Sequence, residues 1–257
     1  MNRAVFSITN GFMTRRMLPL IAAIVLGSLA IDAPAATKKS SSSTKRTTKS
    51  AASPKAASNP YPVIWDDAVP AIKAESAILV DAASGKVLYE RNADERRPVA
   101  STQKLLTALI VAEEGNLSET VRVQSSDTRC EPSKLYIKAG EVYRRHDLLK
   151  ILLVKSMNDV ARCLARDNAG SQEAFAQKMN ERARELGMRH SNFVNPNGLP
   201  AEGQHSTARD IAKLALHAYR NRTIREITRL KSLQWRYPSG KTTTFSNTNR
   251  VLKNFPY

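Results

Sequence analysis

The chain is poor in cysteine, histidine and aromatic residues, and these shortages exclude several kinds of chemistry. Among 257 residues there are two cysteines and four histidines, and aromatic residues make up 6%. The histidines show no metal-ligand spacing, so we expect neither a metal centre nor another cofactor. Neither Cys130 nor Cys163 stands in a motif with a candidate base, which argues against a cysteine nucleophile.

The N-terminal part lacks acidic residues, and its apolar run is short. Residues 1–59 hold nine Lys or Arg and one acid, within a net charge of +17. Arg15 and Arg16 precede the apolar run Met17–Ala30, which is shorter than the roughly 20 residues of a membrane span. Ala33–Ala35 supplies a small-residue cleavage pattern. These features predict a signal peptide over 1–36 and export to the periplasm or cell envelope. A retained anchor and a twin-arginine route stay open.

The next segment, 37–60, has almost no residues that could build a core. It consists largely of Lys, Ser, Thr, Ala and Pro without apolar periodicity, which predicts a disordered basic linker. The folded region should therefore span 61–257. Export and the lack of a basic helix with aromatic partners argue against nucleic-acid binding. Export also permits a disulfide between Cys130 and Cys163, although the sequence does not establish their separation.

Periodicity in the folded region predicts strands, then several helices, then strands. The expected strands cover 77–80 and 87–90, with a hairpin turn at 83–86 between them, and 233–237 and 242–245, with a turn at 238–240. The expected helices begin near 101, 147, 157, 172 and 208, and 192–200 should be a loop rich in Asn, Pro and Gly. Gly115 should end the first helix as a C′ glycine. This order indicates an α/β (α+β) protein in which the last strands rejoin the first in one sheet.

Ser101-Thr102-Gln103-Lys104 places a hydroxyl and an amine three residues apart at the start of an apolar helix. Residues at this spacing lie on one helical face, so Lys104 can take the proton of Ser101. The helix N-terminus favours the negative charge that develops during attack. The motif is also compatible with a capping serine followed by an exposed lysine.

A second polar motif, Ser156-Met157-Asn158, falls at a break between two expected helices. The Ser156 hydroxyl could pass a proton between Lys104 and a leaving nitrogen. Asn158 could hold Lys104 in place and donate its amide to a substrate carbonyl. Ser-x-x-Lys with Ser-x-Asn is a known pairing in penicillin-binding proteins and class A β-lactamases.

Several stretches, in a fixed order, carry a resemblance to one family. They are Ile78–Tyr89, Pro98–Leu109, Leu153–Asp159, Met179–Asn180, Leu186–Met188, Asn195–Leu199 and Ser206–Asp210. Over Ala77–Leu252 the chain resembles the D-alanyl-D-alanine carboxypeptidases, which are low-molecular-weight penicillin-binding proteins.

The resemblance implies the penicilloyl-serine transferase fold, in which helices flank an antiparallel sheet and a helical subdomain is inserted. It also implies that the D-alanyl-D-alanine end of a peptidoglycan stem peptide acylates Ser101 and that water then releases the acyl group. β-Lactams would acylate the same serine. Lys104 would be the general base, Ser156 the proton relay and Asn158 a substrate-binding residue.

The family's third motif, Lys-Thr-Gly, is absent from the sequence. Lys241-Thr242-Thr243 lacks the glycine and lies too early. In the family the motif strand carries a lysine for the substrate carboxylate and one oxyanion-hole amide, and losing one such donor can cost about 10²–10³ in rate. We therefore expect the catalytic region to be incomplete at its C-terminus, with sheet strands missing.

Three alternatives to a carboxypeptidase follow. A D,D-endopeptidase acting on cross-links stays open because both enzymes cleave D,D-bonds. An inactive remnant or a wall-binding protein stays open because of the missing motif. A β-lactamase is weaker, because the deacylating glutamate of class A enzymes has no evident counterpart.

Overall fold

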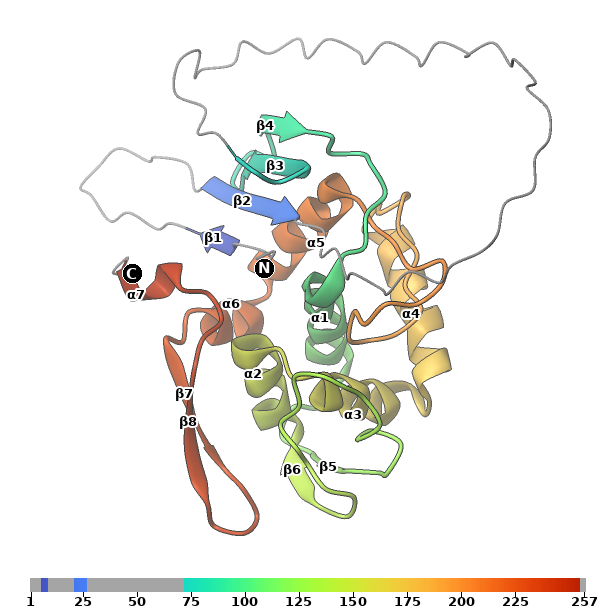
Figure 1. Ribbon diagram of the computed structural model, residues 1–257, viewed down its shortest axis with the longest axis vertical. Helices are drawn as coiled ribbons and strands as arrows, with labels where there is room; N and C mark the ends of the chain where they lie inside the picture. Colours follow the sequence, from blue (N-terminus) through green and yellow to red (C-terminus); the bar gives the residue numbers. More distant parts are fainter. Residues whose placement is uncertain (1–5, 9–20, 27–71, 255–257) are drawn as a thin grey trace, which may run out of the picture.

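The computed structural model describes residues 6–8, 21–26 and 72–254 (Figure 1). The elements are β1 (Phe6–Ile8), β2 (Ile21–Leu26), β3 (Ser76–Asp81), β4 (Val87–Arg91), a 3₁₀ turn (Ala100–Gln103), α1 (Lys104–Glu114), β5 (Thr120–Arg122), β6 (Val142–Arg144), α2 (Arg145–Lys155), α3 (Asn158–Ala169), α4 (Gln172–Glu185), α5 (Ala208–Arg220), α6 (Arg222–Thr228), β7 (Ser232–Arg236), β8 (Thr242–Ser246) and α7 (Val251–Asn254). This mixture of helices and short antiparallel sheets confirms the α/β class.

The main sheet has the strand order β1-β2-β3-β4, and all its neighbours are antiparallel. β3 is almost wholly buried, as expected for a strand with a partner on each side and α5 packed against it. The β3–β4 hairpin forms as predicted. Asp81 stabilises its turn by accepting hydrogen bonds from the Ser84 backbone N–H and hydroxyl, both at 2.6 Å.

The N-terminal part of the chain contributes two strands to this sheet. β2 pairs with β3 from Ile21 opposite Asp81 to Leu26 opposite Ser76, and β1 pairs with β2. Part of the predicted signal peptide (1–36) therefore lies in the sheet. The rest of that segment, including the expected cleavage pattern, and the predicted linker (37–60) lie outside the described residues.

The last strands do not rejoin the first sheet, so that prediction is wrong. β7 and β8 pair with each other in the predicted hairpin, from Ser232 opposite Ser246 to Arg236 opposite Thr242, and form a separate two-stranded sheet. The hairpin packs on α2. β3 already pairs with β2 on one side and β4 on the other, so it has no free edge for the last strands. The hairpin is held instead by burial of Trp235, which is 4% exposed and contacts Tyr143 of β6 at 5.2 Å between ring centroids.

The helical part is built around α1, which contacts α2, α3, α4, α5 and α6 (Figure 1). α1 ends at Gly115 as predicted, but the residue has φ −92°, so its interpretation as a left-handed C′ glycine is wrong. Glycine is required there for space: a Cβ would lie 2.7 Å from Val111 O and 3.0 Å from Arg145 Cδ. No helix in the described ranges is long and apolar enough to cross a bilayer.

Candidate active site

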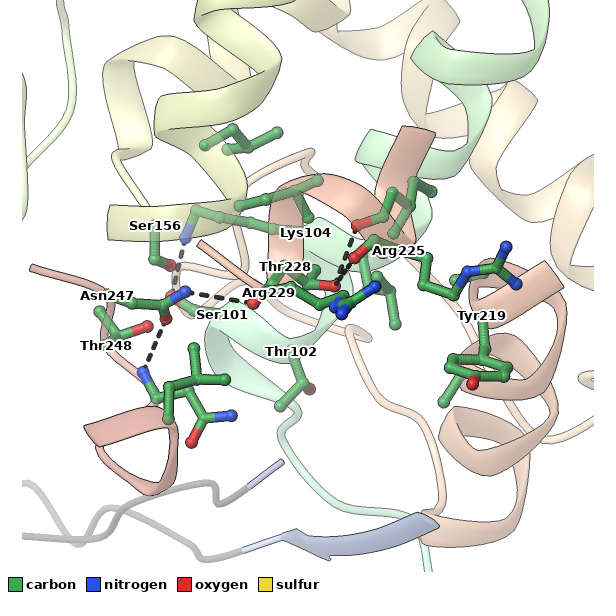
Figure 2. A pocket seen from close by; sticks show the side chains of 18 residues that line it. Ser101, Thr102, Lys104, Ser156, Tyr219, Arg225, Thr228, Arg229, Asn247 and Thr248 are labelled. Atoms are coloured by element: carbon green, nitrogen blue, oxygen red, sulfur yellow. Dashed lines mark hydrogen bonds between the residues drawn. The ribbon is translucent and has the colours of Figure 1, made fainter. Parts of the chain in front are cut away.

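A cavity of about 380 Å³ lies where α1, α2, α5, α6 and the 247–252 segment meet. Three of the four predicted site residues, Ser101, Lys104 and Ser156, line it (Figure 2). The rest of its surface is largely apolar and comes from Leu105, Leu152, Leu153, Ala215, Ala218, Tyr219, Ile224 and Leu252, with polar contributions from Thr102, Arg225, Thr228, Arg229, Asn247, Thr248 and Asn249.

Ser101 and Lys104 form a hydrogen-bonded pair at one end of the cavity. Ser101 lies in the 3₁₀ turn that leads into α1, and its side chain is accessible, whereas Lys104 is 3% exposed. Lys104 Nζ lies 2.7 Å from Ser101 Oγ. The i, i+3 spacing therefore produces the contact that the sequence predicts, and an amine stands beside a hydroxyl that a substrate can reach.

The charge state of Lys104 is set by its surroundings. Burial lowers the pKa of the ammonium from 10.5 to about 7, and the neighbouring Cys130 acts in the opposite direction. An amine with such a pKa is partly neutral near neutral pH and can accept a proton. Both thiols are free, and burial raises the pKa of Cys130 to about 11, which leaves it a poor nucleophile.

Ser156 lies at the junction of α2 and α3. It is the C-cap of α2 and has a left-handed backbone (φ 65°, ψ 42°), which turns the chain before α3 begins at Asn158. A non-glycine residue in this region is uncommon and is held by its surroundings. The turn brings the Ser156 side chain into the cavity, and in Figure 2 it points toward Lys104 and Ser101.

Asn158 is the predicted site residue that does not line the cavity. It is 4% exposed, its Nδ2 donates to Pro132 O at 2.6 Å and its backbone N–H donates to Ser133 O at 2.8 Å. Its Oδ1 is buried without a hydrogen-bond partner among the described residues. In this arrangement Asn158 ties the 132–133 backbone to the start of α3, and its role toward a substrate remains a prediction.

Sequence reasoning assigned no role to the 195–199 loop, although it contains contacts to the site. Asn197 O accepts a hydrogen bond from Lys104 Nζ at 2.5 Å. The Asn, Pro and Gly residues of 192–200 predicted a loop, but nothing in the sequence shows where a backbone carbonyl points. The loop therefore reaches the site through its backbone, and Asn197 lies 93 positions after Lys104 in the chain.

The segment before α7 also borders the cavity. Asn247 and Thr248 line it, and Thr248 N–H donates to Val154 O at 3.0 Å, which attaches the segment to α2. By contrast, Thr242 and Thr243, from the sequence that superficially resembles a third motif, belong to β8 and do not line the cavity.

A serine hydroxyl against a partly neutral lysine amine, at the start of a helix and open to a cavity, is suited to acyl transfer through a covalent intermediate. The comparisons with known proteins agree with this class. Residues 65–256 match the family model described as D-alanyl-D-alanine carboxypeptidase, Peptidase_S11. The chain therefore belongs to this family of penicillin-binding serine peptidases.

Individual relatives support the assignment. The D-alanyl-D-alanine carboxypeptidase DacF of Bacillus subtilis is 34% identical over 189 residues, which are 72% of this chain and 49% of that protein. A D-alanyl-D-alanine endopeptidase of Escherichia coli is 35% identical over 188 residues, 71% of this chain and 60% of that protein. The chain thus spans about half to three fifths of the length of these relatives.

Solved structures show the same fold. A D-alanyl-D-alanine carboxypeptidase from Mycobacterium tuberculosis superposes with a TM-score of 0.67 at 33% identity, over 71% of this chain and 69% of that one. The predicted D,D-peptidase fold is therefore confirmed.

Proposed function

We propose that the chain is a serine-type D-alanyl-D-alanine carboxypeptidase that acts on peptidoglycan stem peptides through an acyl-enzyme on Ser101. The observation that carries the proposal is the 2.7 Å contact between Ser101 Oγ and a Lys104 amine whose pKa lies near 7. Membership of the carboxypeptidase family supports the substrate class. The apolar run and basic residues near the N-terminus support export to the envelope, where this substrate is found.

In the acylation step, Ser101 Oγ attacks the carbonyl carbon of the penultimate D-alanine while its proton passes to Lys104 Nζ. The start of α1 favours the negative charge on the tetrahedral intermediate. When the C–N bond breaks, the leaving amine takes a proton from Lys104, with Ser156 as the proposed relay. Free D-alanine leaves, and the ester on Ser101 remains.

In the second step a water molecule attacks this ester. Lys104, neutral again, accepts a proton from the water, and Ser101 regains its own proton as the acyl group leaves. A β-lactam would open on Ser101 by the same first step. Asn158 is the remaining proposed substrate contact. Its Nδ2 donates one N–H to Pro132 O, and the second N–H is the group that would bind a substrate carbonyl.

Labelling with a fluorescent penicillin tests the proposal. We expect one covalent adduct on the intact chain, its mass located on the peptide that contains Ser101, and release of D-alanine from a peptide ending in D-Ala-D-Ala. Ser101→Ala should abolish both signals. Ser118→Ala, on an exposed serine outside the cavity, is the matched control and should label normally. An unlabelled wild-type chain would instead favour an inactive remnant or a wall-binding protein.

A D,D-endopeptidase is the second candidate, because relatives at similar identity carry that name. The chemistry at Ser101 is the same, and only the leaving group differs. Parallel assays with a stem pentapeptide and a cross-linked muropeptide dimer separate the two activities. Faster cleavage of the dimer would favour the endopeptidase.

A further inference from the structure

The 195–199 loop is joined to the start of α1 by three successive carbonyl groups. The donor and acceptor pairs are Gln103 Nε2 with Asn195 O, Thr107 Oγ1 with Pro196 O at 2.7 Å, and Lys104 Nζ with Asn197 O at 2.5 Å. All three donor side chains belong to buried residues. One of these donors is the lysine that contacts Ser101, so the position of the loop and the position of the amine depend on each other.

The loop can approach this closely because residue 198 has no side chain. A Cβ on Gly198 would lie 2.0 Å from Ala100 O, 2.4 Å from Ala100 C and 3.1 Å from Ser101 N. These atoms form the peptide bond that precedes Ser101. Gly198 also has φ +84°, and Ala100 has φ 46°, an uncommon value for alanine. The two backbones therefore pack against each other beside the serine.

The Asn197 carbonyl restricts how the amine can turn. A neutral amine has two N–H groups and one lone pair, and a carbonyl oxygen can only accept. Asn197 O therefore accepts a hydrogen bond from Lys104 Nζ in either protonation state of the lysine. With one N–H held there, Nζ is kept beside Ser101 Oγ, and its lone pair is available to the Ser101 hydroxyl proton.

We propose that Gly198 is a positioning residue for Lys104: its missing side chain lets the 195–199 loop pack on the Ala100–Ser101 peptide and hold the amine against Ser101. The inference rests on the function proposed above, in which Lys104 is the base. In this role the loop affects the reaction through its backbone, by holding Lys104, and makes no contact with the substrate.

The matched pair Gly198→Ala and Gly170→Ala tests the proposal. Gly170 has the same φ of +84°, but nothing lies within 4 Å of its Cβ position, so the control carries the backbone strain without the collision. We expect Gly170→Ala to react with a fluorescent penicillin within about twofold of the wild-type rate. Gly198→Ala should react at least about 100-fold more slowly, because small displacements of reacting groups have effects of that size.

A measurement that does not depend on reaction separates positioning from general damage. The pKa of Lys104 can be followed by NMR of the full chain labelled with ¹³C-lysine, and in the wild type it should lie near 7. It should be unchanged in Gly170→Ala and displaced in Gly198→Ala, which loses the Asn197 acceptor. Cys130, the titratable neighbour that raises the pKa of Lys104, is unchanged in both variants, so it does not account for a difference between them. An unchanged pKa in folded Gly198→Ala, or equal losses of rate in the two variants, would overturn the proposal.

Thr107→Val covers the case in which Gly198→Ala does not fold. The change keeps the side-chain volume and removes only the hydroxyl that holds Pro196 O. Reaction should slow by about 3- to 10-fold, the equivalent of losing one hydrogen bond, and a wild-type rate with a wild-type Lys104 pKa would reject the positioning role. If the wild-type chain itself does not react, the proposed function fails, and the Lys104 pKa still decides whether the loop positions the amine.

Discussion

The cavity has two walls that are built in different ways. The polar wall, Ser101, Lys104 and Ser156, lies on short turns at helix ends, and the Lys104 amine is held by hydrogen bonds to Ser101 and to the distant Asn197 carbonyl. The apolar wall, Ala215, Ala218, Ile224 and Leu252, is formed by residues that are nearly inaccessible and packed among other apolar side chains. The polar wall holds the reacting oxygen and nitrogen atoms at defined positions. The apolar wall gives the cavity its shape and holds no reacting atom.

This difference separates two kinds of consequence. Hydrogen bonds depend steeply on distance and angle, so changes on the polar wall should alter reaction rates more than the free energy of unfolding. Apolar packing is less directional, so changes on the apolar wall should alter the free energy of unfolding more than rates. Four measurements test this difference between the two walls.

Lys104→Met should have the largest effect. The substitution keeps an unbranched buried side chain but removes the base, and we expect the rate of penicillin acylation to fall by about 10³-fold. Circular dichroism should show an intact fold, since the change also removes a buried amine. Acylation within tenfold of wild type would mean that another group takes the Ser101 proton.

The pH dependence of acylation should be the next largest effect. The pKa of Lys104 is lowered from 10.5 to about 7, so the neutral, proton-accepting form predominates above that value and is lost as the pH falls through it. We expect the rate to fall by about tenfold per pH unit below pH 6 and to level off above pH 8. A rate that still rises above pH 9 would show that Lys104 keeps an ordinary pKa.

Ile224→Ala tests the apolar wall. Ile224 is 2% exposed, and its truncation should lower the free energy of unfolding by about 2–4 kcal/mol, measured by denaturant titration. Corrected for the folded fraction, the acylation rate should stay within about threefold of wild type. A much larger loss of rate in the folded protein would show that the two walls are coupled.

Lys241→Ala should have the smallest effect. Lys241 immediately precedes β8, is exposed and does not line the cavity. Its replacement should leave both penicillin labelling and the melting temperature unchanged within error. A loss of labelling would place Lys241 at the site and contradict the conclusion that Lys241-Thr242-Thr243 is not the third motif.

Local patterns in the sequence predicted much of the fold and the centre of the site. The contact between Ser101 and Lys104 follows from the i, i+3 geometry of a helical turn. The β3–β4 and β7–β8 hairpins follow from strand patterns around short turns. Each of these depends on residues that are close in the chain, and local geometry leaves them few alternatives.

The strands β3, β4, β7 and β8, the helices α1 to α5 and the chemical identity of the reacting pair therefore followed from local sequence patterns, because backbone geometry and apolar periodicity act over a few residues. The strands β1, β2, β5 and β6 and the short helices α6 and α7 did not. Tertiary contacts, by contrast, are what make β7 and β8 pack on α2 instead of joining β3. Tertiary contacts also bring Gly198 against the peptide before Ser101 and Asn158 against Pro132. These are contacts between distant segments, made partly by backbone atoms that every residue carries, so no local pattern of side chains encodes them.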